Sequence, residues 1–204
     1  MGSAGLHFQS GDSTLWAVVV GAVLATVGGF VATQFEGFLR RRERERSAAL
    51  LFGELLSVLA IIATMADESR GRGDPYGPLT TRLLRAVRRE AETYDRNREA
   101  LFDLRDGKIR ARIHTLMVRV TLALDGVFDA TGQIALADAA AGAPGLDDAA
   151  KAQALARLDT LLADRDLSFD FVVETVAQIK PIVSTLEPLA RQSFDAHAAV
   201  ARDL

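Results

Sequence analysis

The chain contains no cysteine and only three lysines and three histidines among its 204 residues. Without cysteine there is no disulfide framework, no thiolate metal site and no cysteine nucleophile. His7, His114 and His197 are far apart in sequence, and none is followed four residues later by a second histidine or a carboxylate. Because that spacing is what places two ligands on one helix face, the sequence predicts no metal site and no cofactor.

Motifs for nucleotide binding and acyl transfer are also missing. The glycines of residues 70–77 follow no predicted strand and precede no Lys-Ser or Lys-Thr pair, and no Gly-x-Ser-x-Gly sequence occurs. Basic side chains number 24 against 27 acidic ones, so there is no excess of positive charge for coating nucleic acid. We therefore expect no catalytic residue, no small-molecule substrate and no nucleic-acid partner.

Charge is absent from residues 13–35, and 49% of the whole chain is hydrophobic. At a helical rise of about 1.5 Å per residue, residues 15–35 extend roughly 30 Å, which is the thickness of the hydrocarbon core of a bilayer. The sequence predicts a short tail over residues 1–12 and a transmembrane helix over residues 13–36. The membrane lipid is accordingly an expected partner.

A basic segment follows the apolar stretch directly, and we name residues 37–46 the juxtamembrane collar. Five positive charges fall within it, at Arg40, Arg41, Arg42, Arg44 and Arg46. Residues 1–14 contain one charged side chain, Asp12, so the positive-inside rule places the N-terminus outside and the rest in the cytoplasm. A cleaved signal peptide has its positive charges before the apolar stretch. We expect an uncleaved anchor in the inner (cytoplasmic) membrane of a bacterium.

Small residues recur every four positions along the predicted span, and we name them the small-residue stripe: Ala17, Gly21, Ala25, Gly29 and Thr33. Such a stripe lets two helices approach closely within a membrane. It predicts an interface with a second copy of the chain or with another membrane protein. The alternative is that the stripe only reflects how common Gly and Ala are in membrane spans.

The remaining residues, 47–204, have no stretch with the period-two alternation of a strand and read as helices throughout. In residues 47–66 an apolar line with 4,3,4,3 spacing predicts the buried face: Leu51, Leu55, Val58, Ile62 and Met65. Glu54 leaves only 12 uncharged residues beyond it, too few to cross a bilayer. A hairpin that embeds residues 50–65 in lipid stays open as an alternative.

Further helices are predicted over residues 79–104, 109–141 and 148–163, and from about residue 166 almost to the C-terminus. Asp147 is the predicted N-cap of the helix over residues 148–163. Glycine and proline place a loop at residues 70–78 and a break at residues 143–145. Pro181 and Pro188 should kink or split the last helix. The predicted fold is all-α: one N-terminal transmembrane helix followed by a cytoplasmic antiparallel bundle, residues 47–204, of about four to five helices.

One polar cluster is predicted from helical spacing, formed by Tyr94, Asn97 and Arg98. It is either a binding notch or a helix junction closed by hydrogen bonds. The motif Tyr-x-x-Asn-Arg-x-x-Leu, which ends at Leu101, follows the span and the collar in sequence. This layout of roughly the first 125 residues resembles small bacterial membrane-anchored helical proteins of unknown role. No function follows from the resemblance.

Charge is unevenly divided: residues 1–120 have 18 basic and 14 acidic side chains, whereas residues 121–204 have 6 and 13. The basic half adjoins the predicted membrane surface, where anionic headgroups attract it, and the acidic half faces solvent or a basic partner. The leading functional hypothesis is an oligomeric, membrane-anchored interaction or scaffold subunit. The alternative is an oligomeric pore or transport component, and a lipid-surface enzyme is disfavoured because no His or carboxylate constellation occurs.

Overall fold

The structure is a computed structural model that describes residues 11–142 and 147–195, although the side chains of residues 11–20 and 22–33 lie outside the description. Within these ranges the chain forms helices and no strand. The predicted all-α class is therefore confirmed for the described residues. The chain divides into two compact units, Met1–Glu43 and Arg44–Leu204, and we call the second the helical unit.

Helix α1 comprises Gly11–Arg70 and contributes to both units. Sequence patterns predicted a separate helix over residues 47–66, but these residues continue α1 without a break. The reason is local, because residues 40–46 of the collar are all arginine or glutamate, which are strong helix formers, and α1 contains no proline. A single helix thus joins the predicted span to the helical unit.

The face of α1 that enters the core differs from the one expected. Its buried line has 3,4,3,4,3 spacing and consists of Ala49, Phe52, Leu56, Leu59, Ala63 and Ala66, each at most 3% exposed. In the predicted line only Leu55 is buried, and Met65 is 43% exposed. The prediction selected a line of larger aliphatic side chains, whereas the buried line combines three alanines with Phe52, Leu56 and Leu59.

Helix α2, Pro78–Asn97, begins at a proline. Proline is favoured in the first turn because a backbone N–H at that position would have no hydrogen-bond partner within the helix. The predicted helix 79–104 does not keep α-geometry to its end, since Arg98–Asp103 form a 3-10 helix, η1. Helix α3, Gly107–Ala141, follows. The Asp106 side chain accepts a hydrogen bond from the Lys108 backbone N–H at 2.7 Å and so caps the start of α3.

Helix α4, Asp148–Val176, continues through residues 163–168, where the sequence predicted a boundary. Its predicted cap is confirmed, because the Asp147 carboxylate accepts from the Ala150 N–H at 2.6 Å. The break falls at residues 177–178, and α5 comprises Ile179–Ala190. Pro181 accounts for this break, since it has no N–H to donate to the carbonyl four residues earlier, at Ala177. Pro188 lies inside α5.

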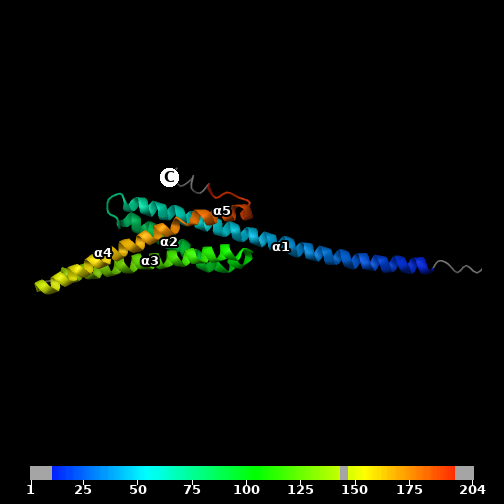
Figure 1. Cartoon of the computed structure of the whole chain (residues 1–204), viewed down its shortest axis with the longest axis horizontal. Coiled ribbons are helices and arrows are strands. Elements are labelled where there is room, and N and C mark those ends of the chain that lie inside the picture. Colours follow the sequence, from blue (N-terminus) through cyan, green and yellow to red (C-terminus); the bar gives the residue numbers. More distant parts are fainter. Residues whose placement is uncertain (1–10, 143–146, 196–204) are drawn as a thin grey trace, which may run out of the picture. The chain divides into compact units, whose positions relative to one another are not determined.

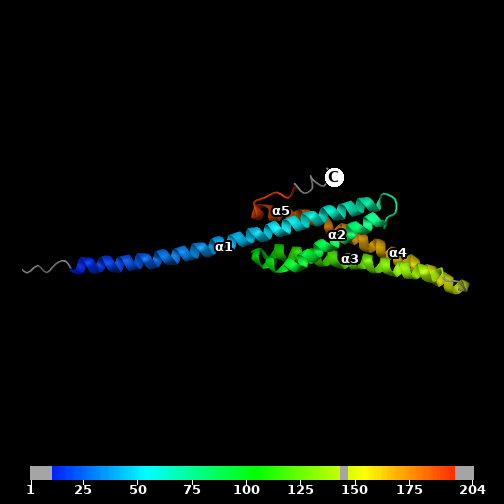
Figure 2. The ribbon, with the colours of Figure 1, turned by 180° about the vertical axis from the view of Figure 1, so that it is seen from behind.

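Helices α3 and α4 lie side by side as an antiparallel pair (Figures 1 and 2). They approach closely at Gly126, where an added Cβ would lie 2.6 Å from the Ser168 hydroxyl oxygen. The N-terminal part of α3 and the C-terminal part of α4 pack against the C-terminal half of α1, together with α2 and α5, around one continuous core. Its largest fully buried side chains are Phe52, Phe169, Leu56, Leu59, Leu84, Leu104, Ile113, Met117, Leu124, Ile179, Leu186 and Val87.

After α5 the chain turns back onto α1. Arg191 has a left-handed backbone, with φ of 56°, and ends the helix. The Glu187 carboxylate then accepts hydrogen bonds from the Ser193 hydroxyl and the Phe194 backbone N–H, both at 3.1 Å. These contacts direct the buried Phe194 ring onto Gly53 of α1.

Candidate functional site

The predicted helix–helix interface lies on α1. Of the small-residue stripe, Ala17, Ala25, Gly29 and Thr33 have side chains outside the described residues. Gly21 is described and exposed, and a Cβ built on it would meet no atom within 4 Å. The space beside Gly21 is therefore not filled by another part of the described chain.

The collar arginines Arg40, Arg41 and Arg42 are exposed on the first unit. Arg40 lies 3.7 Å from the Glu36 carboxylate, one helical turn earlier, and the Arg42 guanidinium lies 5.9 Å from the centre of the Phe38 ring. Phe35, Phe38 and Leu39 are each about half exposed or more. An exposed belt of aromatic and arginine side chains is typical of a membrane–water interface.

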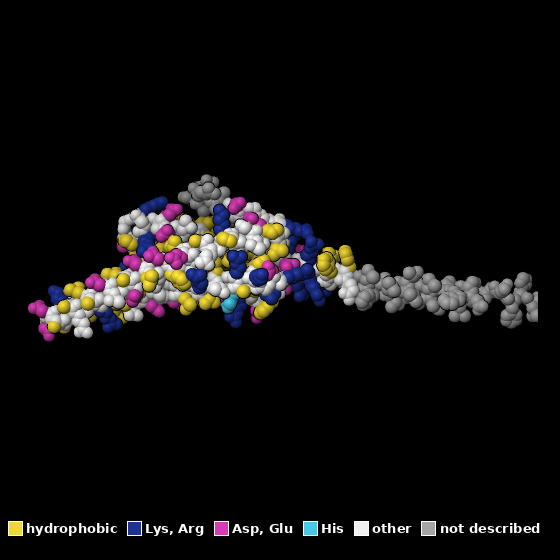
Figure 3. Space-filling view, viewed as in Figure 1, with side chains coloured by type: hydrophobic (Ala, Val, Ile, Leu, Met, Phe, Trp, Pro, Cys, Tyr) yellow, Lys and Arg dark blue, Asp and Glu magenta, His cyan; other side chains and the backbone are white. Residues whose placement is uncertain are grey.

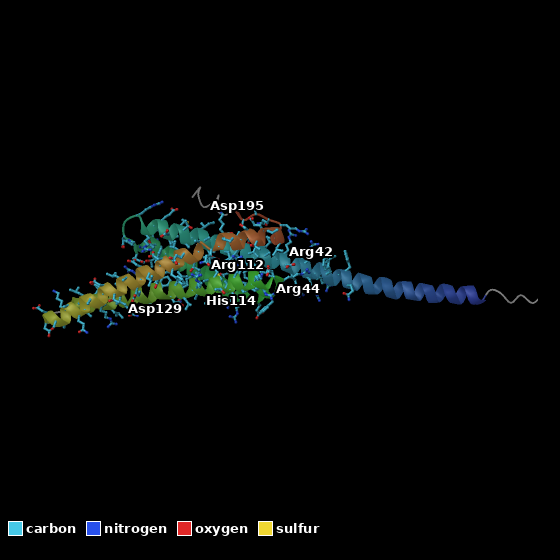
Figure 4. The ribbon with its side chains drawn as sticks, viewed as in Figure 1. Arg42, Arg44, Arg112, His114, Asp129 and Asp195 are labelled. Atoms are coloured by element: carbon cyan, nitrogen blue, oxygen red, sulfur yellow. The ribbon has the colours of Figure 1, made fainter. Side chains whose placement is uncertain are left out.

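In the helical unit the collar continues with Arg44 and Arg46, both exposed (Figure 4 labels Arg42 and Arg44 on α1). The Arg46 Nε donates to the Ala190 carbonyl at 3.3 Å, which ties the end of α5 to α1. Arginine and not lysine suits this position, because its fork can bind a carbonyl and still present N–H groups outward.

Residues 98–108, which we name the η1 turn, lie at the same end of the helical unit. The Glu45 carboxylate accepts from the Arg105 backbone N–H at 3.2 Å and lies 3.4 Å from the Arg105 guanidinium. Arg110 closes the turn by donating to the Leu104 carbonyl at 2.6 Å. Sequence reasoning gave this turn no role, because the pairing of Glu45 with Arg105 joins residues 60 positions apart.

The predicted polar cluster does not form one site. Tyr94 is 2% exposed and contacts Phe52 in the core, and its hydroxyl lies 2.9 Å from His114 Nδ1 on α3. Burial raises the pKa of Tyr94, and the charge of Asp95 raises it further. Asn97 donates to the Thr93 carbonyl at 2.8 Å, while Arg98 is exposed at the start of η1. The three residues lie at the junction between α2 and η1 but face different surroundings.

His114 is exposed on α3 beside Arg112 (both labelled in Figure 4). His114 and Tyr94 are 20 positions apart and lie on two different helices. Spacing rules apply within one helix, so the sequence did not predict this contact.

A second network, also absent from the sequence expectations, holds the α1–α2 loop against α4. The Tyr76 hydroxyl donates to Asp166, and Arg70 pairs with both Asp166 and Asp170. The Arg165 guanidinium stacks 3.6 Å from the centre of the Tyr76 ring. Burial, followed by the hydrogen bond to Asp166, raises the pKa of Tyr76. The two arginines and the two aspartates of this network balance in charge. We therefore interpret it as a structural contact that holds the loop on α4 and not as a ligand site.

An open groove of about 570 Å³ separates α1 from α4 and α5. Its walls are mostly small or aliphatic, with Asp67, Lys180 and Asp195 as the charged residues among its lining. It lacks the set of convergent polar groups that fixes a small ligand in place. Among the described residues, no group of three or more His, Asp or Glu side chains could hold a metal ion.

Two described helices, Gln34–Arg70 and Gly107–Ala141, are long and apolar enough to cross a membrane by length and composition. Both are compatible with membrane association. No family model, curated protein or solved structure matches the chain.

Proposed function

We propose that this protein is a membrane-anchored scaffold or accessory subunit that self-associates through its N-terminal span and binds other proteins through its helical unit. The span is residues 13–36, the N-terminus lies outside, and the helical unit lies in the cytoplasm of a bacterium. No chemical step is assigned.

The observation that carries the proposal is the continuity of α1. An uncharged segment long enough to cross a bilayer passes through an arginine-rich collar into a helix whose far half is buried in the core of the helical unit. Because α1 runs through both units without a break, the proposed anchor and the helical unit are joined by continuous helix and not by a loop. Association of two anchors would therefore bring two helical units together.

The alternative is a pore or transport component with more than one span. It is favoured by α3, which is also long and apolar enough to cross a membrane. Against it, α3 has charged side chains at intervals along its length: Lys108, Arg110, Arg112, Arg119, Asp125, Asp129 and Asp138. Its apolar face, including Ile113, Val120 and Val127, is buried against other helices. Both features are typical of a core helix of a water-soluble domain, so we assign α3 to the helical unit.

The proposed self-association is tested by enlarging the small-residue stripe. Gly21→Ile with Gly29→Ile adds bulk at the closest approach of two helices, and crosslinking between full-length chains in membranes should fall strongly. Insertion should survive because the hydropathy of the span rises. Crosslinking yield, normalised to the amount of membrane-inserted protein, is the measurement.

The matched control is Val20→Ile with Val27→Ile, which adds methyl groups away from the stripe and should leave crosslinking unchanged. Equal crosslinking of both double variants and the parent chain would refute association through the stripe. Ion flux across liposomes that contain the purified chain, with loss of flux in the stripe variant, would instead favour the alternative function.

A further inference from the structure

The η1 turn lies at the end of the helical unit where α1 enters it, because Arg105 of the turn contacts Glu45 by its backbone and its side chain. Glu45 follows Phe35, the last residue of the uncharged segment, by ten positions on the same helix. At about 1.5 Å per residue these positions are roughly 15 Å apart along α1. The contact of the η1 turn on α1 is therefore only ten residues along the chain from the segment proposed as the anchor.

Phe102 is the outstanding side chain of this turn. It is 79% exposed, the highest value for a large apolar side chain in the described part of the chain. Leu101 and Leu104 on either side are 7% and 0% exposed, so the turn is fixed to the core while Phe102 points outward. The boundary between headgroups and acyl chains accommodates such a ring, because its apolar surface would there be removed from water.

The charges around Phe102 complement an anionic lipid surface. Residues 96–112 have six basic side chains against three acidic ones, and Arg98, Lys108 and Arg112 are exposed. One of the acidic groups, Asp106, is already used to cap α3. Dark-blue side chains gather at one end of the helical unit (Figure 3). Basic side chains beside an exposed aromatic ring are the pattern of a membrane-surface contact.

We propose that the η1 turn docks on anionic phospholipids, with Phe102 inserted at the headgroup–acyl boundary and Arg98 and Lys108 at lipid phosphates. This inference rests on the proposed membrane anchorage and deepens it. The helical unit then has a second contact with the bilayer besides its anchor. That contact fixes which face of the unit is turned to lipid and which faces are presented to partners.

The absence of cysteine makes the test direct, because a single introduced cysteine is the only site for a thiol label. The full chain with Phe102→Cys is labelled with bimane, an apolar fluorophore, and placed in nanodiscs of phosphatidylcholine and phosphatidylglycerol with brominated acyl chains. We expect loss of roughly half of the bimane emission, since a group about 5–10 Å deep in the boundary is within reach of the bromines. Bimane at Leu136→Cys, a site on α3 that is 74% exposed, should not be quenched.

A second variant pair tests the native ring. With bimane on Glu99→Cys, quenching should be present in the chain that keeps Phe102 and should be lost on Phe102→Ser. Because Phe102 is exposed, this substitution leaves the core intact, which the circular dichroism spectrum checks.

The single tryptophan, Trp16, reports on the anchor in the same samples. Quenched Trp16 with unquenched bimane at residue 102 overturns the docking proposal and spares the anchor, whereas unquenched Trp16 overturns the anchor itself. Equal bimane quenching in purely zwitterionic nanodiscs overturns the role of anionic lipid. Bimane that is shielded from water but not quenched by bromine overturns the proposal in favour of a protein covering the turn.

Discussion

At the scale of single residues, the contact between Gly53 and Phe194 shows most clearly how the chain closes its core. A Cβ on Gly53 would overlap the Phe194 ring, which is 2% exposed. Glu187 holds that segment in place by accepting hydrogen bonds from the Ser193 hydroxyl and the Phe194 backbone N–H. Glycine at position 53 thus lets the residues after α5 pack on α1, although glycine weakens a helix interior.

We expect Gly53→Ala to destabilise the protein by about 1–3 kcal/mol, because the added methyl group forces the Phe194 ring out of its position. Gly132→Ala is the matched control: Gly132 lies in α3, and a Cβ there meets nothing within 4 Å. That variant should gain about 0.5–1 kcal/mol from helix propensity alone. Urea unfolding of the detergent-solubilised chain, followed by circular dichroism, measures both.

The cost of Gly53→Ala should disappear in a Phe194→Ala background, where the ring is gone. If Gly53→Ala still destabilises the protein in the Phe194→Ala background, the loss of stability does not arise from the contact between residues 53 and 194.

At the scale of elements, α1 contains two interleaved apolar lines, and packing selects one of them. Both lines have helical spacing, so periodicity alone does not choose between them. The line with alanines at positions 49, 63 and 66 is the buried one. Arg46, Ser69 and Arg70 then bond to residues of α5, α2 and α4.

This assignment predicts unequal costs for two truncations of similar size on the same helix. Leu56→Ala should destabilise the protein by about 2–5 kcal/mol, because Leu56 is fully buried. Met65→Ala should cost about 0.5 kcal/mol or less, because Met65 is 43% exposed. The difference in urea midpoint between the two variants is the measurement. A larger loss of stability for Met65→Ala than for Leu56→Ala would show that the line predicted from sequence is the buried one.

At the scale of the whole molecule, the proposed function depends on orientation. The arginines of the collar follow the uncharged segment, and more basic side chains lie on the η1 turn at the same end of the helical unit. Both groups would face the cytoplasmic side, where anionic lipids attract positive charge. A chain inserted the other way would have to translocate the helical unit and its basic end.

We expect a tag after Leu204 to be cytoplasmic and a tag at Gly2 to be periplasmic. External protease added to spheroplasts should remove only the N-terminal tag. Moving three arginines from positions 40–42 to the segment before the span should weaken or invert this pattern, because positive charge near the ends of the span sets its orientation. Protection of both tags in the parent chain would contradict the proposed orientation.

Amino-acid sequence alone determined those features of this protein that depend on local chemistry. The uncharged length of residues 13–35 predicts a span, which stays a prediction, whereas the 3.6-residue period predicted helices that the structure contains. Local capping chemistry placed the start of α4 at Asp147, because a cap involves only residues three or four apart. The prolines likewise predicted that the last helix would be divided near Pro181.

Tertiary structure decided what depends on residues distant in sequence. It selected the buried line of α1, paired Tyr94 with His114, and brought Arg105 to Glu45 at the end where α1 enters the helical unit. It also left Phe102 exposed between two buried leucines, a contrast that no helical period encodes. The physical reason is the same in each case, because several faces of each helix are apolar or basic. Which face is used depends on how closely the neighbouring helices can pack.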